Sequence, residues 1–249
     1  MGTTGRGIGR SDVLTENLMY KYELHCHTGR TSACGVMSAE EIVALYLANG
    51  YDGVVITDHF LNGNTTVNRE LPGGTYEEKI DLFCKGYEEV KEKAEGKLKV
   101  FFGFEASYKG TDILVYGLDG EKLKAFPDIP AMDLRSLADF CREQGALAVQ
   151  AHPFREDFYI DHIRLYPNCE GVEALNSART SLCNDLGFYY AKAYGKIATG
   201  GSDLHRPEQK MLSGMAFDEE VTSVGQLVTL LRAGKGTILH QPNCYARQE

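Results

Sequence analysis

The sequence predicts an α/β barrel, in which strands and helices alternate and the strands close into a curved sheet. Apolar runs typical of buried strands alternate with helical patterns along the chain, and no linker interrupts them. Polar side chains directly follow several of these runs. A barrel gathers the carboxyl ends of its strands at one face, whereas a doubly wound sheet concentrates its chemistry at one crevice. We therefore expect a parallel barrel.

The length and composition indicate one large globular domain. The chain has 249 residues, 43% of them hydrophobic and 24% charged, which is ample for a hydrophobic core. Its formal net charge of −9 argues against a nucleic-acid surface, because phosphate backbones are met by excess Lys and Arg. It does not exclude a small anionic substrate, since bound metal ions can reverse the local field.

Neither a membrane span nor a secretory signal is expected. No apolar stretch approaches the length of a membrane span, and no signal-like segment opens the chain. Residues 1–20 are rich in Gly and Thr, so we expect them to be disordered or a remnant of an expression tag, and residues 21–249 to form the barrel domain. The seven cysteines are odd in number and form no CxxC pair, which predicts free thiols in a reducing cytoplasm.

The first three expected elements follow from their local patterns. The run Tyr22–His27 is a strand that ends on an imidazole. Ser38 and Glu41 form a capping box that begins a helix, which ends at Asn49-Gly50. The next strand, Gly53–Thr57, is nearly all apolar, as expected when both faces of a sheet are covered.

The middle of the chain continues the alternation. A charged helix is expected over Tyr76–Ala94, followed by a strand over Leu98–Phe104 and a second apolar run over Ile113–Tyr116. A helix over Asp133–Gln144 then precedes a strand over Leu147–Gln150. The pattern is that of repeated βα units.

The last third of the chain follows the same pattern. The expected elements are a strand over Val172–Leu175, a helix over Ser181–Tyr194, a strand over Lys196–Thr199, a helix over Val224–Ala233 and a short strand over Thr237–His240. The chain is therefore expected to end with a helix and a short strand.

Seven side chains of the kinds that bind metals stand where apolar runs end. Imidazole nitrogen and carboxylate oxygen are the ligands that zinc, iron and manganese accept. His25 and His27 are separated by one residue, so on a strand they point to the same side. This grouping predicts a multinuclear metal site with hydrolytic chemistry. The predicted ligands are His25, His27, His59, Glu105, His152, Asp203 and His205.

Some of these positions suggest more specific roles. Glu105 follows an aromatic strand, where an unpaired carboxylate would be costly, and its two oxygens suit a ligand that bridges two ions. Asp58 precedes His59 and either orients an imidazole, accepts a proton or caps a turn. Pro153 ends the strand before it, and the pair Gly200-Gly201 lets the backbone turn near the ions.

The order of these motifs resembles a known superfamily. H-x-H, T-D-H, G-x-E, H-P and S-D-x-H, spanning Leu24 to His205, resemble the polymerase and histidinol phosphatase (PHP) superfamily of metal-dependent phosphoesterases. The resemblance implies a distorted (β/α)7 barrel similar to a TIM barrel, holding two or three zinc, iron or manganese ions. It also implies ligand roles for the seven residues above.

Two positions depart from the pattern of the superfamily. Five or six residues after the H-x-H the superfamily has an Asp or His, but this chain has Ser32 and Ala33, followed by Cys34 as a candidate replacement. A superfamily histidine near ILVYG has no counterpart, so Asp112 or Asp119 could replace it; capping of the strand explains these two carboxylates equally well.

Cationic and amide side chains near the motifs are candidates for substrate binding. Arg30, Arg155 and Arg179 could each hold a phosphate through two parallel hydrogen bonds, or could be ordinary surface arginines. Asn176 could orient the substrate or cap a turn.

Together these features predict an enzyme that hydrolyses a small phosphate monoester with a metal-activated hydroxide. The alternatives are a phosphodiesterase or exonuclease acting on short nucleotides, an amidohydrolase, and a non-catalytic metal-binding regulatory module. Amidohydrolases usually use a metal-bridging lysine, which no expected strand end provides. The expected partner is a small phosphorylated molecule, with no membrane, no long nucleic acid and an oligomeric state left open.

Overall fold

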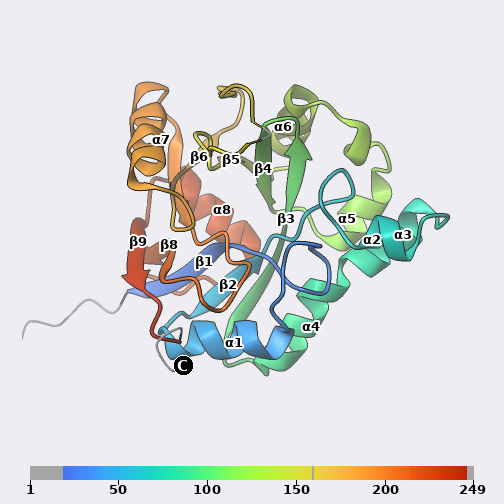
Figure 1. Ribbon diagram of the computed structural model, residues 1–249, viewed down its shortest axis with the longest axis horizontal. Helices are drawn as coiled ribbons and strands as arrows, with labels where there is room; N and C mark the ends of the chain where they lie inside the picture. Colours follow the sequence, from blue (N-terminus) through green and yellow to red (C-terminus); the bar gives the residue numbers. More distant parts are fainter. Residues whose placement is uncertain (1–18, 159, 246–249) are drawn as a thin grey trace, which may run out of the picture.

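The structure, a computed structural model, describes residues 19–158 and 160–245, which fold around one curved nine-stranded sheet (Figure 1). Along the sheet the strands follow the order β7-β6-β5-β4-β3-β2-β1-β8-β9. Their bounds are β1 Tyr20–Cys26, β2 Gly53–Ile56, β3 Lys99–Tyr108, β4 Thr111–Tyr116, β5 Leu147–Ala151, β6 Gly171–Asn176, β7 Ile197–Gly201, β8 Met211–Phe217 and β9 Thr237–Pro242.

Strands β1 to β7 close into a ring. Neighbouring strands pair in sequence from β1 to β7, and the segment after β7 returns to β1. There the backbone N–H of Leu204 donates to the carbonyl oxygen of His25 at 3.2 Å, and the N–H of His27 donates to the carbonyl of Leu204 at 3.0 Å. The predicted distorted (β/α)7 barrel is therefore confirmed, with β8 and β9 added beside β1.

Helices cover the outside of this barrel, and Figure 1 shows α1 and α4 along one side and α7 along another. The predicted capping box at Ser38 is confirmed, and Asp133 caps α6 as its position suggests. The helices are α1 Ala39–Ala48, α2 Val67–Glu70, α3 Tyr76–Phe83, α4 Lys85–Ala94, α5 Gly120–Ala125, the 3₁₀ helix η1 Ile129–Ala131, α6 Leu134–Glu143, α7 Ser181–Ala193 and α8 Val224–Arg232.

One hydrophobic cluster joins strands that lie far apart in the sheet order. It contains Leu24 of β1, Tyr116 of β4, Val149 of β5 and Met215 of β8, all almost completely buried. Helix α8 adds Leu227 and its neighbours to the same cluster. Only a strongly curved sheet brings β5 and β8 to one core, so this packing holds the barrel closed.

Strand direction differs from the expected parallel arrangement at β4. Strand β4 pairs antiparallel with both β3 and β5. Only Lys109 and Gly110 separate β3 from β4, and Gly110 has a φ of 78°. A two-residue connection can form a hairpin but cannot make the crossover that parallel strands need. As a consequence β3 extends three residues beyond Glu105, which lies within the strand rather than at its end.

Several elements were not predicted from the sequence. The strand β8 and the short helices α2 and α5 lie in segments that had been assigned no regular structure. The expected helix over Tyr76–Ala94 is two helices, interrupted at Cys84. At the break, the Thr31 hydroxyl contacts the carbonyl oxygen of Phe83 at 3.3 Å and the N–H of Gly86 at 3.2 Å. A side chain inserted between helical backbone groups is a known cause of such breaks.

The segment over 1–20 falls almost entirely outside the described residues, and only its last residue, Tyr20, belongs to β1. Among the helices of the described residues, none combines the length and the apolar character that crossing a membrane requires.

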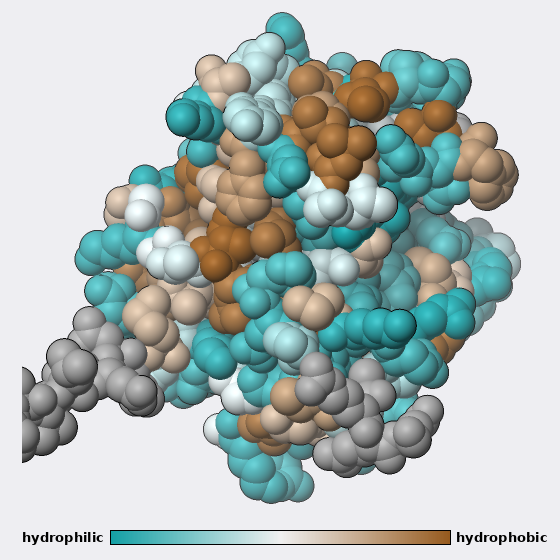
Figure 2. All heavy atoms as spheres, turned by 60° about the vertical axis from the view of Figure 1, so that its left-hand side comes forward, coloured by the Kyte–Doolittle hydropathy of each residue, from teal (hydrophilic) through white to brown (hydrophobic). Residues whose placement is uncertain are grey.

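The outer surface of α7 is partly apolar. Leu182, Phe188 and Tyr189 are 59%, 41% and 72% exposed. Figure 2 shows the side of the molecule on which α7 and β9 lie, where hydrophobic and hydrophilic residues form interspersed patches. None of the groups of candidate metal ligands found among the described residues lies on this helix.

Candidate metal centre

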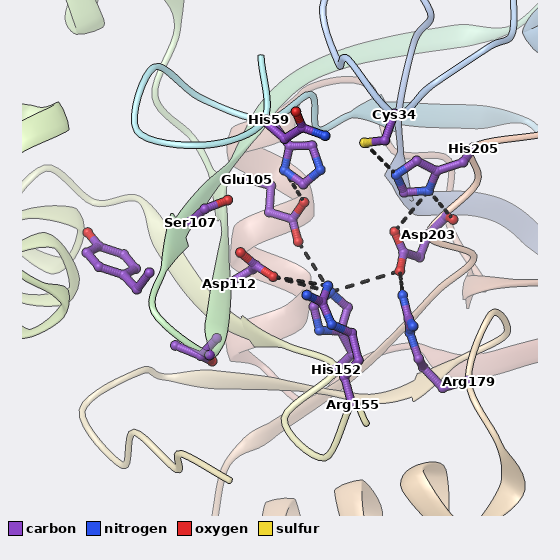
Figure 3. A pocket seen from close by; sticks show the side chains of 14 residues that line it. Cys34, His59, Glu105, Ser107, Asp112, His152, Arg155, Arg179, Asp203 and His205 are labelled. Carbon is purple, nitrogen blue, oxygen red and sulfur yellow. Dashed lines mark hydrogen bonds and ion pairs between the residues drawn. The ribbon is translucent and has the colours of Figure 1, made fainter. Parts of the chain in front are cut away.

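The seven predicted ligand residues converge on one end of the barrel. They come from β1 and the residue after it, from the segment after β2, from β3 and from the segments after β5 and β7, and most of them border a single cavity (Figure 3). Its volume is about 360 Å³. His25 and His27 are fully buried beneath it, and His205 and His59 are partly exposed at its wall. The structure therefore brings together groups that are up to 180 residues apart in the chain.

Glu105 lies at the centre of the imidazoles. Its Oε1 is 3.5 Å from Nε2 of His25 and 3.4 Å from Nε2 of His152. Its Oε2 is 3.3 Å from Nε2 of His27 and 2.9 Å from Nδ1 of His59. Each oxygen thus faces a different pair of histidines, which is the arrangement expected of a carboxylate that bridges two cations.

Asp203 approaches the same group from the opposite side. Its Oδ1 is 3.4 Å from Nε2 of His25 and 3.3 Å from Nδ1 of His205. Its Oδ2 is 2.7 Å from Nη2 of Arg179. The two histidines of the H-x-H motif also approach each other, with Nε2 of His25 only 3.1 Å from Nε2 of His27. The donors therefore point inward at a common volume.

The chemistry of this donor set fits divalent cations. Both oxygens of Glu105 are buried and have no hydrogen-bond partner among the described residues, although the residue is only 1% exposed. A buried carboxylate without hydrogen bonds is costly unless a cation compensates it. Three groups of donors lie close enough to hold an ion, namely His25–His27–Asp203, His25–Glu105–His152 and His27–His59–His205.

Electrostatics keeps the central carboxylates ionised. Burial raises the pKa of Glu105, but His59 and His25 outweigh it and hold that pKa well below its usual range. Burial also raises the pKa of Asp203, but His25, His27 and His152 together outweigh it and hold that pKa well below its usual range. Burial lowers the pKa of His25, but Glu173 and Asp203 raise it well above the usual value. Metal ions that bind among these carboxylates and imidazoles would therefore displace the proton that His25 holds.

The backbone is strained at two of these positions. His152 has a φ of 26° and Asp203 a φ of 52°, values in the left-handed region that non-glycine residues rarely adopt. Strained conformations of this kind cluster at functional sites. Gly201 is needed for close approach rather than for the predicted turn, because a Cβ there would lie 2.6 Å from Cβ of His25.

Glu173 is a buried residue of the site that sequence reasoning missed. Its Oε1 is 2.8 Å from Nδ1 of His25, and its Oε2 accepts hydrogen bonds from the N–H of His152 at 3.0 Å and from Nδ2 of Asn176 at 2.9 Å. It thereby fixes the tautomer and orientation of His25. A single carboxylate within the apolar run GVEALN was the available signal, because a buried strand rarely carries one without a partner.

Asp58 lies behind the ligands and does not border the cavity. Its Oδ1 accepts hydrogen bonds from the N–H of Thr28 and the hydroxyl of Ser32, both at 2.7 Å. The Ser32 hydroxyl is in turn 3.0 Å from Nδ1 of His27. Burial raises the pKa of Asp58 to about 6 despite these bonds. Of the roles considered from the sequence, this geometry favours orientation of an imidazole, because the Ser32 hydroxyl lies between Asp58 and His27.

A second missed carboxylate, Glu23, supports β1 from within. Its Oε1 accepts hydrogen bonds from the N–H groups of His25 and Ser202, both at 2.8 Å, and its Oε2 accepts one from the Tyr46 hydroxyl at 3.1 Å. Burial raises the pKa of Glu23 to about 7, although the bonds from Ser202 lower it. Glu23 therefore ties β1 to the segment after β7 directly beneath the site.

Cys34 and Asp112, two of the three candidate additional ligands, border the cavity. Sγ of Cys34 is 3.2 Å from Nε2 of His205, and Oδ2 of Asp112 is 3.9 Å from Nε2 of His152 (Figure 3). Burial raises the pKa of Cys34, but hydrogen bonds with His205 and His59 lower it to about 6. The third candidate, Asp119, is exposed and lies outside the cavity, where it caps α5 by accepting from the N–H of Lys122 at 2.8 Å.

Two of the three predicted arginines reach the cavity. Arg155 Nη1 is 3.4 Å from Oδ2 of Asp112, and Arg179 pairs with Asp203. Arg30 instead forms an ion pair with Glu70 at 3.0 Å, outside the cavity, which matches the alternative of a surface arginine.

Asn176 is also placed differently from its predicted role. It is 1% exposed, and its amide nitrogen donates to Glu173 at 2.9 Å and to Asp203 at 3.4 Å. The side chain is therefore buried behind the ligands, where it holds two carboxylates in place and does not face the cavity.

No protein-family profile matches the sequence, and no curated protein matches it. Several solved structures resemble the fold. A two-domain protein from Bacteroides vulgatus ATCC 8482 that contains a predicted PHP-like metal-dependent phosphoesterase aligns with a TM-score of 0.63 and 14% identity, over 96% of this chain and 69% of that chain.

Two further structures have other descriptions. PsfC from Pseudomonas syringae PB-5123 aligns with a TM-score of 0.61 and 16% identity, over 92% of this chain and 93% of that one. An amidohydrolase from Chromobacterium violaceum, solved with bound sulfate and no metal, aligns with a TM-score of 0.55 and 15% identity, over 88% of this chain and 97% of that one. This chain therefore shares the fold of these three structures, a distorted barrel.

Proposed function

We propose that this protein is a metal-dependent phosphoesterase that hydrolyses a small phosphate monoester. The observation that carries the proposal is Glu105, a buried carboxylate that has no hydrogen-bond partner among the described residues and whose oxygens face two different pairs of imidazoles. We assign the metal ions to the seven converging side chains. These are His25, His27, His59, Glu105, His152, Asp203 and His205.

The ions would supply an activated water and positive charge at the phosphoryl oxygens. The chain's own residues would position the substrate. Arg155 and Arg179 border the cavity, and a guanidinium can hold a phosphoryl group through two parallel hydrogen bonds. Each now pairs with a carboxylate, Asp112 or Asp203, so substrate binding would rearrange these contacts.

Asp203 is the best-placed proton acceptor. It borders the cavity, and its Oδ1 faces the imidazoles while Oδ2 contacts Arg179. An ionised carboxylate at this place can accept a proton from a water that approaches the ligands. Asp58 would orient the His27 imidazole through the Ser32 hydroxyl, which lies between the two side chains.

The size of the cavity favours a small substrate. A volume of about 360 Å³ accommodates a phosphorylated metabolite but not several nucleotides. The formal net charge of −9 also disfavours a long polyanion. These two properties support a monoester over a nucleic acid, and we expect Mn²⁺, Zn²⁺ or Fe²⁺ as the ions.

The test begins with protein freed of metal by a strong chelator. We expect this preparation to leave phosphomonoesters intact and to regain hydrolysis when manganese, zinc or iron is added. Equal rates for metal-free and untreated protein would show that the proposal is wrong. Faster cleavage of dinucleotides than of monoesters would favour a phosphodiesterase, and metal binding without any hydrolysis would favour a regulatory module.

Two matched variants locate the activity. Glu105→Gln and Asp119→Asn each replace a carboxylate with an amide. We expect Glu105→Gln to lose bound metal and at least about 100-fold in activity, since even the partners of metal ligands contribute about 10–100-fold. Asp119→Asn should retain both properties, because Asn also caps helices and Asp119 lies outside the cavity.

A further inference from the structure

Helix α7 turns an apolar face away from the barrel. Of the ten large hydrophobic residues that are exposed in the described part of the chain, four lie on this one helix, and hydrophobic patches are visible on this side of the molecule (Figure 2). Single exposed hydrophobic residues are normal on protein surfaces, whereas a group of them marks an interaction surface. The four residues, called the α7 patch below, are Leu182, Leu186, Phe188 and Tyr189.

Helical spacing explains why this patch faces outward. Leu182, Leu186 and Tyr189 follow one another at intervals of four and three residues, which places them along one side of the helix. The opposite side is held tightly against β6, because a Cβ at Gly187 would lie only 2.8 Å from the carbonyl oxygen of Ala174. The barrel therefore occupies one side of α7 and leaves the other side without a partner within the described residues.

Two charged residues without partners share the outward side. Asp185 and Lys192 are both exposed, and neither forms a hydrogen bond or an ion pair within the described residues. Two helical turns separate them, a distance of about 10 Å along the axis, which is too far for them to pair with each other. One charge of each sign does not suit a membrane surface or a nucleic acid, both of which attract clusters of cations.

The order of these two charges suits a second copy of the same helix. A two-fold axis beside Phe188 and Tyr189 lies midway between Asp185 and Lys192 in the sequence. In an antiparallel pair around this axis, Asp185 faces Lys192 of the partner subunit, and the same ion pair forms again on the other side of the axis. A parallel pair would instead place equal charges opposite each other. The charges therefore select the antiparallel arrangement.

The α7 patch continues into a hollow between α7, β7 and β9. Phe188 lines this hollow together with Ile197, Met215 and Ile238, and its volume is about 640 Å³. The two-fold axis brings Tyr189 of the partner subunit opposite Phe188, at the rim of the hollow. Aromatic side chains that enter such pockets near the centre of an interface contribute much of its binding energy. The hollow thus offers a place for an anchor from the second copy.

We propose that this protein forms a two-fold symmetric dimer through the outward faces of α7. The α7 patch supplies the apolar centre of the interface, and Asp185 and Lys192 supply two ion pairs beside it. No residue of the α7 patch borders the cavity of the candidate metal centre. Helix α7 begins two residues after Arg179, so the two cavities lie toward opposite ends of the antiparallel helix pair and both stay open to substrate.

Sedimentation equilibrium of the full chain tests this proposal. We expect wild-type protein to dimerise, and Asp185→Lys or Lys192→Asp to raise the dissociation constant at least about tenfold, because each variant places like charges opposite each other twice. The double variant Asp185→Lys/Lys192→Asp should dimerise like wild type, since both ion pairs form again with their signs reversed. An equal mixture of the two single variants should likewise form mixed dimers.

The control variant is Asp218→Lys, which makes the same charge change at an exposed residue outside α7 and should leave the dissociation constant unchanged. Circular dichroism checks that every variant is folded. A monomeric wild-type protein would overturn the proposal, as would a dimer that the single variants do not weaken or that the double variant does not restore. Cross-links between α7 and residues 1–18 within a monomer would show that the chain covers its own patch, and would also overturn it. None of these results bears on metal-dependent hydrolysis, which is tested separately.

Discussion

At the scale of single residues, the site depends on carboxylates that hold the ligands as much as on the ligands. The seven ligand-type residues were predictable because each stands at or near the end of an apolar run. A polar side chain buried there is costly unless it has a binding partner. Glu173 and Glu23 were missed because they lie inside such runs, and only the structure reveals that Glu173 contacts His25 and that Glu23 contacts Ser202.

The contact between Glu173 and His25 leads to a prediction about metal affinity. Glu173→Gln keeps the shape of the side chain but removes the charge beside Nδ1 of His25. We expect metal affinity to fall about 10–100-fold, as it does when partners of metal-binding histidines are altered. Isothermal titration with zinc measures this, and circular dichroism checks that the fold is kept. An unchanged affinity would mean that Glu173 has only a structural role.

The two arginines of the cavity and Arg30 allow a matched comparison. Arg179→Lys keeps a positive charge near Asp203 but removes the planar group that holds a phosphate through two bonds. We expect KM for a phosphomonoester to rise about tenfold, since a hydrogen bond to a charged group contributes about 1.5 kcal/mol or more. Arg30→Lys, at an exposed ion pair with Glu70, should leave steady-state kinetics unchanged. Equal effects of the two variants would argue against a role of Arg179 in substrate binding.

At the scale of elements, the positions of strands and helices were more predictable than their directions and interruptions. Helix α1 was predicted from its capping box, and β2 from its apolar run. The antiparallel direction of β4 was missed because the expected strands ended at Phe104 and began again at Ile113, which left room for a crossover. In the structure only Lys109 and Gly110 connect the two strands. The break between α3 and α4 depends on a contact with Thr31, about fifty residues earlier, which local sequence does not reveal.

Just after this break, Gly86 of α4 packs closely against Thr28, Thr31 and Asp58, which lie behind the candidate ligands. A Cβ at Gly86 would lie 2.5 Å from Oδ2 of Asp58 and 2.8 Å from Oγ1 of Thr31. Gly86→Ala should therefore lower the free energy of unfolding by about 1–3 kcal/mol, the usual cost of overpacking. Urea denaturation measures this change. Gly73→Ala is the control, because no atom lies within 4 Å of its Cβ, and it should be neutral or slightly stabilising. Equal stability of the two variants would contradict the tight contact.

At the scale of the whole molecule, the candidate metal centre is built from the same strands that form the barrel. The resemblance of the ordered motifs to the PHP superfamily implied a ring of seven strands, whereas the apolar runs and the polar residues after them predicted a barrel without its number of strands. The sequence did not reveal how the ring closes, since that depends on Leu204 pairing with β1 and on Glu23 binding the N–H of Ser202. These contacts join segments about 180 residues apart.

Because the ligands come from strands all around the ring, bound metal should stabilise the entire barrel. Binding to the folded state alone adds about 2.7 kcal/mol when the ion is present at 100 times its Kd. For a domain of this size we expect Tm to fall by roughly 5–10 °C on chelation and to recover when zinc is added. Differential scanning calorimetry measures this shift. A Tm that does not respond to the chelator would mean that the strands do not share bound ions.

The most direct measurement is anomalous X-ray diffraction from crystals loaded with zinc or manganese and soaked with phosphate. We predict anomalous peaks on both sides of the Glu105 carboxylate, in contact with His25 and His152, and phosphate in the cavity near Arg179. Fully loaded crystals with no peak beside Glu105, or with peaks only elsewhere on the protein, would contradict a metal centre at this end of the barrel.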